Sequence, residues 1–178
     1  MNEPRIPEAD DDGPTAELLR VRRGGELSTL DRLLLHSPPV AEGWNALLGA
    51  LRGAMTLPAD LRELVVLRVA VLNGAAFEWA AHAPIARRAG LTDLHLRVLR
   101  ADDALAEPVW SPVQAAVLAF TDASTRDVTV PEEVFAGVRE HLDDRQVVEL
   151  TALVGGYAMV SRFLVALDVP PSTGEVPG

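Results

Sequence analysis

The sequence places two ionisable side chains, Glu78 and His82, in a run over residues 73–86 that otherwise reads as an apolar helix. At a spacing of four residues on a helix, the two side chains lie on one face and can meet. A carboxylate beside an imidazole can determine which ring nitrogen carries the proton, and such a pair can act as a general acid or base near neutral pH. The same spacing is common on solvated helix faces, so the two residues alone leave both interpretations open.

Two of the charged residues in the preceding apolar segment, residues 58–73, are further candidates. Glu63 is close to the start of this segment, where a carboxylate also favours the helix dipole without any chemical role. Arg68 lies deeper, and a buried arginine must be paired. Its partner could be a local carboxylate that holds helices together or a carboxylate of a substrate, for which a guanidinium is geometrically suited.

Four aromatic side chains are candidates for the lining of a substrate pocket: Trp44, Phe77, Trp79 and Tyr157. Each of them taken singly could equally be ordinary core or interface packing. A Glu-x3-His spacing is a weak indication of a metal site, and the HExxH motif is absent. We therefore expect no metal site.

The elements that would position these residues are predicted to be helices. The chain has 178 residues, 48% hydrophobic but only 4% aromatic, so its core must consist mainly of alanine, leucine and valine, which favours helices. The segments 58–73 and 75–89 have almost no polar face, which is typical of helices buried on all sides. We expect one all-α domain of about six to eight helices over residues 15–169, a disordered acidic tail over 1–14 and a flexible tail over 170–178.

The charge balance excludes several classes of partner. With 16 basic and 26 acidic residues the net charge is −10, which argues against nucleic acid and against an anionic membrane surface. The sequence contains no cysteine, which excludes disulfides and thiol redox chemistry. The acidic start lacks the features of a signal peptide, and no apolar run is expected to reach the length of a membrane span, so a cytoplasmic location is expected.

The order of the charged residues resembles a known family. Glu63 is followed by eleven residues, Ala75, two residues, Glu78, three residues and His82, and then by the segment IARRAGL. This order is similar to that of the alkyl hydroperoxidase D / carboxymuconolactone decarboxylase family. In its peroxidase branch, cysteines occupy the positions of Ala75 and Glu78, and the residues matching Glu63 and His82 form a proton relay. The Phe77-Glu78-Trp79 segment is more similar to the decarboxylase-like branch.

The resemblance implies an all-helical fold that assembles as a dimer, trimer or hexamer. Without cysteine a thiol peroxidase mechanism is impossible. What remains is a cofactor-independent acid–base enzyme with His82 as acid or base, Glu78 as its partner and Glu63 as the relay carboxylate. Its small-molecule substrate would be carboxylated or lactone-like, and the reaction a decarboxylation, isomerisation, cyclisation or elimination. The alternative is a non-catalytic ligand-binding or oligomeric scaffold of the same fold.

Overall fold

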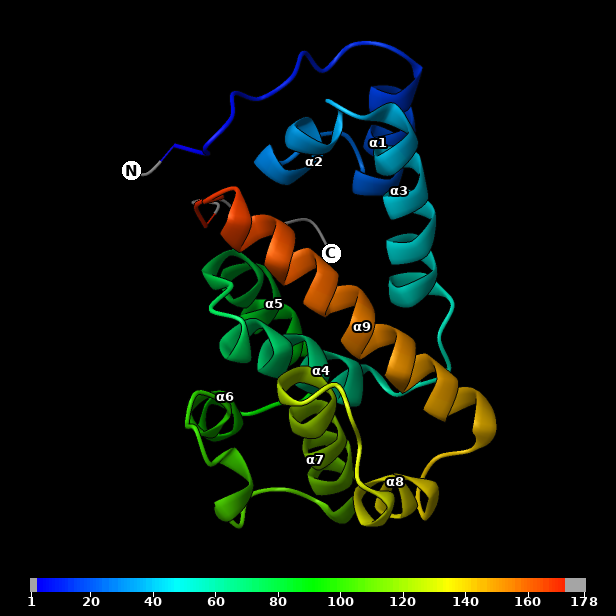
Figure 1. Cartoon of the computed structure of the whole chain (residues 1–178), viewed down its shortest axis with the longest axis vertical. Coiled ribbons are helices and arrows are strands. Elements are labelled where there is room, and N and C mark those ends of the chain that lie inside the picture. Colours follow the sequence, from blue (N-terminus) through cyan, green and yellow to red (C-terminus); the bar gives the residue numbers. More distant parts are fainter. Residues whose placement is uncertain (1–2, 172–178) are drawn as a thin grey trace.

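The computed structural model describes residues 3–171, and every regular element within that range is a helix (Figure 1). It contains nine α-helices and one short 3-10 helix, against the six to eight helices expected. The additional ones are short segments such as α2 and α8 that pack on longer helices. In chain order the elements are α1 (Pro14–Arg23), α2 (Thr29–Leu34), α3 (Pro38–Gly53), α4 (Ala59–Leu72), α5 (Ala76–Arg88), α6 (Asp93–Leu99), η1 (Ala104–Ala106), α7 (Pro112–Arg126), α8 (Glu132–Arg139) and α9 (Asp144–Ala166).

Side-chain caps account for where several helices begin. Ser28, Thr92, Ser111 and Asp143 each accept a hydrogen bond from the backbone N–H three residues later. In all four cases the side chain at that third position bonds back to the backbone N–H of the cap, which completes a capping box. Such boxes satisfy N–H groups that a helix cannot pair internally. The sequence therefore specifies these starts locally.

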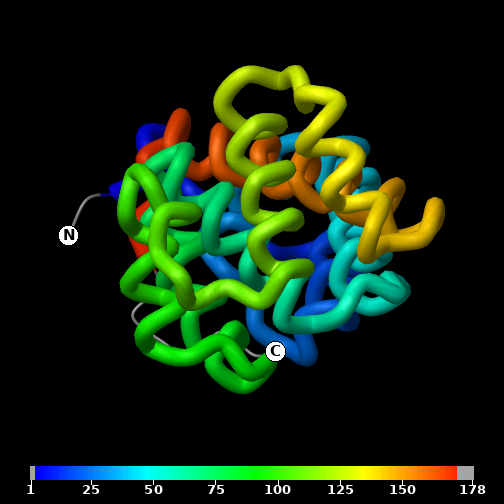
Figure 2. Tube along the Cα trace, turned by 90° about the horizontal axis from the view of Figure 1, so that it is seen from below, coloured from blue at the N-terminus to red at the C-terminus, as the bar shows by residue number. Residues whose placement is uncertain are grey.

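The core is built around α4, which contacts α5, α7 and α9. In Figure 1, α4, α5 and α9 occupy the middle of the molecule, with α1–α3 at one end and α6–α8 at the other. Seen from below in Figure 2, α7 and α8 (yellow-green to yellow) lie nearer the viewer than α9. Helix α7 contacts both α8 and α9. This arrangement buries both faces of α4, which explains why its sequence is apolar nearly all round.

The last helix, α9, is long and apolar enough to span a membrane by length and composition, contrary to the expectation that no such run exists. However, 56% of its most apolar window is buried inside the protein, against α3, α4 and α7. Its hydrophobicity is therefore that of a central core helix.

The expected N-terminal boundary coincides with the start of α1 at Pro14. Residues 3–13 form no helix, and they lie against the domain: the Arg5 N–H donates to the Leu167 carbonyl at 2.8 Å. The predicted C-terminal tail, over residues 170–178, lies outside the described residues from residue 172 onward.

Candidate active site

A tight turn between α4 and α5 brings Glu63 and His82 together. The turn covers residues 73–75, and Gly74 has a φ of 68°, a left-handed conformation that glycine adopts at little cost. The two helices then pack along each other. Glu63 in the early turns of α4 consequently faces His82 in the middle of α5.

His82 lies between two carboxylates. Its Nδ1 is 2.8 Å from Oε2 of Glu63, and its Nε2 is 3.4 Å from Oε2 of Glu78. Both His82 and Glu78 are buried, at 5% and 2% exposure. The first contact has hydrogen-bond geometry, whereas the Glu78 oxygen has no hydrogen-bond partner among residues 3–171 despite its proximity to the ring. A buried polar atom without a partner is costly, so this oxygen is available to a ligand.

The two carboxylates contact different nitrogens of one imidazole, and therefore approach the ring from different sides. They cannot converge on one metal ion with the ring between them. Within the described residues there is no group of three or more His, Cys, Asp or Glu side chains arranged to hold a metal.

Tyr157 of α9 completes this part of the site. Its ring packs edge-to-face on the His82 ring, with centroids 5.3 Å apart, and its hydroxyl accepts a hydrogen bond from Nε of Arg52 at 3.2 Å. Burial raises the pKa of the Tyr157 phenol above its usual range; Arg52 opposes this change, and the charge of Glu78 adds to it. The phenol therefore keeps its proton, which it can donate to a ligand because its contact with Arg52 uses only the oxygen.

These side chains line a cavity of about 390 Å³. This volume lies in the usual range for small-molecule sites. Apolar side chains, including Phe77, Val66, Ile85 and Leu153, form part of its wall. The charged residues that line it are Arg22, Arg23, Arg52, Arg62, Glu63, Glu78 and His82.

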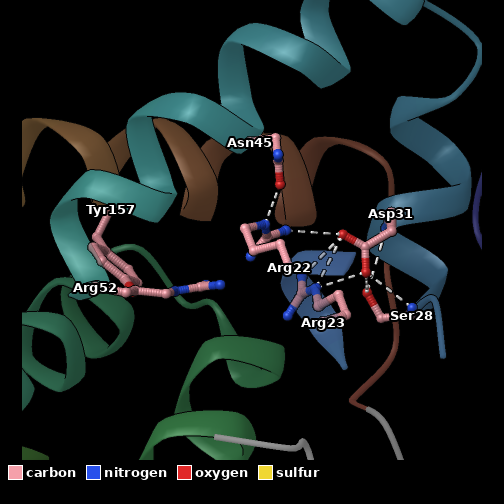
Figure 3. A network of polar contacts seen from close by, with 7 residues as sticks. All are labelled: Arg22, Arg23, Ser28, Asp31, Asn45, Arg52 and Tyr157. Atoms are coloured by element: carbon pink, nitrogen blue, oxygen red, sulfur yellow. Dashed lines mark hydrogen bonds and ion pairs between the residues drawn. The ribbon is translucent and has the colours of Figure 1, made fainter. Parts of the chain in front are cut away.

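A cluster of arginines forms the second polar part of the cavity (Figure 3). Arg22 and Arg23, at the end of α1, both pair with Asp31, which is fully buried. Asp31 also accepts hydrogen bonds from the backbone N–H and the hydroxyl of Ser28. Arg22 additionally donates from Nε to Asn45 of α3. The positions of Arg22 and Arg23 are thus fixed by the protein itself.

Arg22 and Arg52 remain charged at neutral pH. Burial, together with the charges of Arg23 and Arg52, lowers the pKa of Arg22 from its ordinary value to about 10. Burial acts in the same direction on Arg52, but its contacts with Tyr157 and the charge of Glu78 outweigh burial and raise the pKa of Arg52 above its ordinary value.

The structure decides between the two options for Arg68 in favour of a local carboxylate, so its candidacy as a substrate-binding residue is corrected. Arg68 is fully buried and forms a two-point ion pair with Asp122 of α7, with Nε–Oδ1 2.6 Å and Nη2–Oδ2 2.7 Å. Its remaining N–H groups donate to the backbone carbonyls of Leu99, Ala101 and Asp102. All its donors are used, and it does not line the cavity. Arg68 is therefore the structural pair that the sequence left as one of two options.

Two of the four aromatic side chains that were expected to line a pocket do so. Phe77 and Tyr157 line the cavity. Trp44 instead packs edge-to-face on Phe163 in the core, and Trp79 lies under the guanidinium of Arg100, 3.9 Å from the ring centroid. Neither tryptophan lines the cavity, because each is held on another face of its helix by these contacts.

Comparison of the sequence with known proteins shows the family of this chain. The profile of the Carboxymuconolactone decarboxylase family matches residues 38–123. The uncharacterized protein YdfG of Bacillus subtilis (strain 168) is 32% identical over 108 residues, which cover 60% of this chain and 72% of that protein. The chain belongs to the carboxymuconolactone decarboxylase family, and the resemblance read from Glu63, Glu78 and His82 is confirmed.

Solved structures show the same fold at lower identity. An uncharacterized peroxidase-related protein with an alkylhydroperoxidase AhpD core, from Ralstonia eutropha JMP134, superimposes with a TM-score of 0.78 at 20% identity, covering 96% of this chain and 93% of that one. The debrominase Bmp8 in complex with 2,3,4-tribromopyrrole gives a TM-score of 0.71 at 16% identity, covering 90% of this chain and 84% of that one. The predicted all-α, AhpD-like fold is thus confirmed.

Sequence reasoning missed the arginine side of the cavity. Arg52 and Arg22 lie on helices with many exposed positions, and nothing in their spacing relates them to His82. Asp31 was equally inconspicuous, since an acidic residue three positions after Ser28 is explained by the capping box alone. A pair of adjacent arginines at the end of a helix is an ordinary sequence feature.

Proposed function

We propose that the protein is a cofactor-independent acid–base enzyme that acts on a small carboxylated or lactone-like compound. The observation that carries this proposal is the placement of His82 between the carboxylates of Glu63 and Glu78 in the wall of a cavity. A titratable triad in the wall of a cavity is a typical arrangement for proton transfer to and from a bound molecule. Membership of the family supports the same chemistry.

In this proposal the two carboxylates have different roles. Glu63 accepts the Nδ1 proton of His82, which orients the ring and leaves Nε2 as the exchanging nitrogen. Nε2 lies 3.4 Å from Oε2 of Glu78, which has no hydrogen-bond partner among the described residues, so either atom can carry the one mobile proton that is exchanged with a substrate. That proton can be delivered to a substrate carbon, or the pair can accept one from it.

A decarboxylation illustrates how the atoms balance. The bond between a ring carbon and its carboxylate breaks, carbon dioxide leaves, and the electron pair moves toward the lactone carbonyl as an enolate. The proton shared by Glu78 and His82 is then transferred to carbon. The Tyr157 O–H can stabilise the enolate oxygen by donating a hydrogen bond to it. Isomerisation uses the same pair to remove a proton from one carbon and return it to another.

Thiol peroxidase activity is incompatible with this chain. That reaction requires a cysteine thiolate, and the sequence contains no cysteine. Ala75, at one of the family's cysteine positions, is a helix N-cap with no reactive group, and Glu78 provides a carboxylate at the other. A cytoplasmic location and assembly into a dimer, trimer or hexamer stay predictions.

The proposal is tested by turnover of carboxymuconolactone and a panel of carboxylated butenolides, followed by carbon dioxide release and by ultraviolet absorbance. We expect the wild-type protein to convert at least one of them and His82→Asn to be slower by about 10²–10⁴-fold, the usual contribution of general acid–base catalysis. His141→Asn is the matched control, because His141 is exposed and lies outside the cavity. Equal rates for wild type and His82→Asn, or no rate above that of buffer across the panel, would contradict the proposal and favour a non-catalytic scaffold of the same fold.

A further inference from the structure

We propose that Arg52, together with Arg22, forms an anion subsite in the cavity that binds a carboxylate of the substrate while a carbon of the same molecule faces His82. This inference rests on the proposed function and specifies its substrate class. It also replaces Arg68, whose donors are all used elsewhere, as the side chain that recognises a substrate carboxylate.

Arg52 lacks a counter-charge among the described residues. It lines the cavity, and within residues 3–171 it forms no ion pair; its guanidinium makes one hydrogen bond, from Nε to the neutral Tyr157 hydroxyl. Both terminal amino groups are without a hydrogen-bond partner in that range. A partly buried guanidinium in this state has lost water without gaining a carboxylate. An anionic ligand in the cavity would supply the missing negative charge and would bind in the two-point geometry that guanidinium groups favour.

The cations next to Arg52 are held in place although they repel one another. Asp31 pairs with both Arg22 and Arg23, and Asn45 fixes Arg22 from the side of α3. Figure 3 shows the Arg52 guanidinium extending from Tyr157 toward this cluster. One buried carboxylate thus faces three guanidinium groups in this part of the cavity, in a chain whose net charge is −10. Such a local excess of positive charge is a recognition feature for an anion.

The acidic groups of the cavity form no ion pair with Arg52. Glu63 contacts Nδ1 of His82, and Glu78 lies beside Nε2. The charge of Glu78 does influence Arg52 electrostatically, but the two side chains form no ion pair. The cavity is therefore divided into an acid–base part and a cationic part, and a substrate that carries a carboxylate on a small ring would contact both.

Part of the subsite lies outside the segment that defines the family. Arg52 is within residues 38–123, whereas Arg22, Arg23 and their anchor Asp31 precede it. Helix α1 thus supplies cations, anchored by Asp31 of α2, to a site whose acid–base groups lie on α4 and α5. The choice of substrate would then depend on this N-terminal portion, while the proton chemistry would depend on the family motif.

The test is equilibrium binding by titration calorimetry at pH 7.5 in a low-salt buffer free of carboxylates and phosphate. The probes are maleate, its uncharged diamide and inorganic phosphate. We expect maleate to bind at least about tenfold more tightly than the diamide, and Arg52→Gln and Arg22→Gln each to weaken maleate binding by about tenfold. Arg139→Gln is the matched control, since Arg139 is an exposed α8 residue paired with Asp144, and it should leave the affinity unchanged.

Equal affinities for maleate and the diamide, or unchanged maleate affinity in both cavity variants, would overturn the subsite. Tighter binding of phosphate than of maleate would overturn its assignment to a carboxylate. Circular dichroism establishes that each variant is folded, and if Arg52→Gln does not fold, Arg22→Gln alone decides. His82→Asn should keep the maleate affinity, so loss of turnover in that variant and loss of anion binding in the arginine variants report separately on the proposed function and on the subsite.

Discussion

The Nδ1 atom of His82 lies 2.8 Å from Oε2 of Glu63, although the two residues are 19 positions apart on different helices. The contact fixes the orientation of the imidazole and directs its other nitrogen toward Glu78. It also ties the candidate chemistry to the α4–α5 turn, because a shift of either helix along the other would separate the two atoms.

The first prediction concerns the roles of the two carboxylates. Glu63→Gln keeps the size of the side chain but removes its charge and offers an amide N–H, so it no longer selects one tautomer of His82. We expect a decrease in kcat of about 10²-fold, at the low end of the range for general acid–base catalysis, with little change in KM. Glu78→Gln removes the group that shares the mobile proton, and we expect a larger decrease. Steady-state kinetics check both, and an unchanged kcat in Glu63→Gln would contradict the orienting role.

The second prediction concerns the buried pair of Arg68 and Asp122. Removing one partner leaves a buried charge without compensation, so Arg68→Met should lower the free energy of unfolding by about 3–5 kcal/mol. The comparison is Arg139→Met, which breaks an exposed pair worth about 0–1 kcal/mol. Urea denaturation measures both values. Similar losses in the two variants would show that Arg68 is not the structural anchor that its five hydrogen bonds indicate.

The third prediction distinguishes two adjacent glycines of α9. A Cβ at Gly155 would have no atom within 4 Å, whereas a Cβ at Gly156 would lie 2.7 Å from Cδ1 of Leu51, which lines the cavity. Gly155→Ala should raise the free energy of unfolding by about 1 kcal/mol through helix propensity. In Gly156→Ala the same gain is offset by displacement of Leu51, a type of overpacking that costs about 1–3 kcal/mol.

Thermal or urea unfolding of the two alanine variants side by side checks this difference. Because Leu51 would move in Gly156→Ala, that variant should also show altered maleate affinity, while Gly155→Ala should not. Equal stabilisation of the two variants would contradict the close approach of α3 and α9.

The fourth prediction is a pH dependence of stability that arises at Glu149. Its Oε2 accepts hydrogen bonds from the backbone N–H groups of Thr56 and Leu57, and its Oε1 pairs with Arg145. Burial alone would raise the pKa of Glu149, but these hydrogen bonds, with Leu57 first among them, outweigh burial and lower the pKa below its ordinary value of 4.5. The carboxylate thereby holds the segment between α3 and α4 onto α9.

A carboxyl group whose pKa is lowered by folding contributes stability that is fully present above the unfolded-state value. This stability is lost as the pH falls through the lower folded-state value. Glu149→Gln should therefore cost about 1 kcal/mol at pH 7, and the difference from wild type should disappear at acid pH. Urea unfolding between pH 7 and pH 3.5 measures this difference, and a difference independent of pH would refute the assignment to the Glu149 charge.

Features that depend on residues close together in the sequence could be predicted, whereas contacts between residues far apart in the sequence could not. Helix starts at Ser28 and Asp143 follow from capping residues a few positions away, and the central position of α4 follows from its apolar faces. These features are local, so composition and spacing specify them. The all-helical class and the approximate positions of the long helices could be predicted for the same reason.

The candidate site was predictable only where its members share a motif. Glu63, Glu78 and His82 lie on two consecutive helices, and their order resembles the family pattern. The partner of Arg68 is 54 residues away on α7, and Arg52 meets Tyr157 over a separation of 105 residues. Such pairings depend on how the helices pack, and no local spacing encodes them. The sequence therefore left open whether Arg68 pairs with a local carboxylate or with a substrate, and it gave no indication that Arg52 lines the same cavity as His82.

The central claim is that His82 and its carboxylates deliver a proton to a bound substrate, and turnover in deuterium oxide tests it most directly. Carboxymuconolactone is incubated with wild-type protein or His82→Asn, and the product is examined by NMR for deuterium at the carbon that gains the proton. The account predicts a single deuterium on one face of that carbon in the wild-type reaction, and at most a small fraction of that rate in His82→Asn. Deuterium on both faces equally, formed at the same rate in His82→Asn and in wild type, would contradict it.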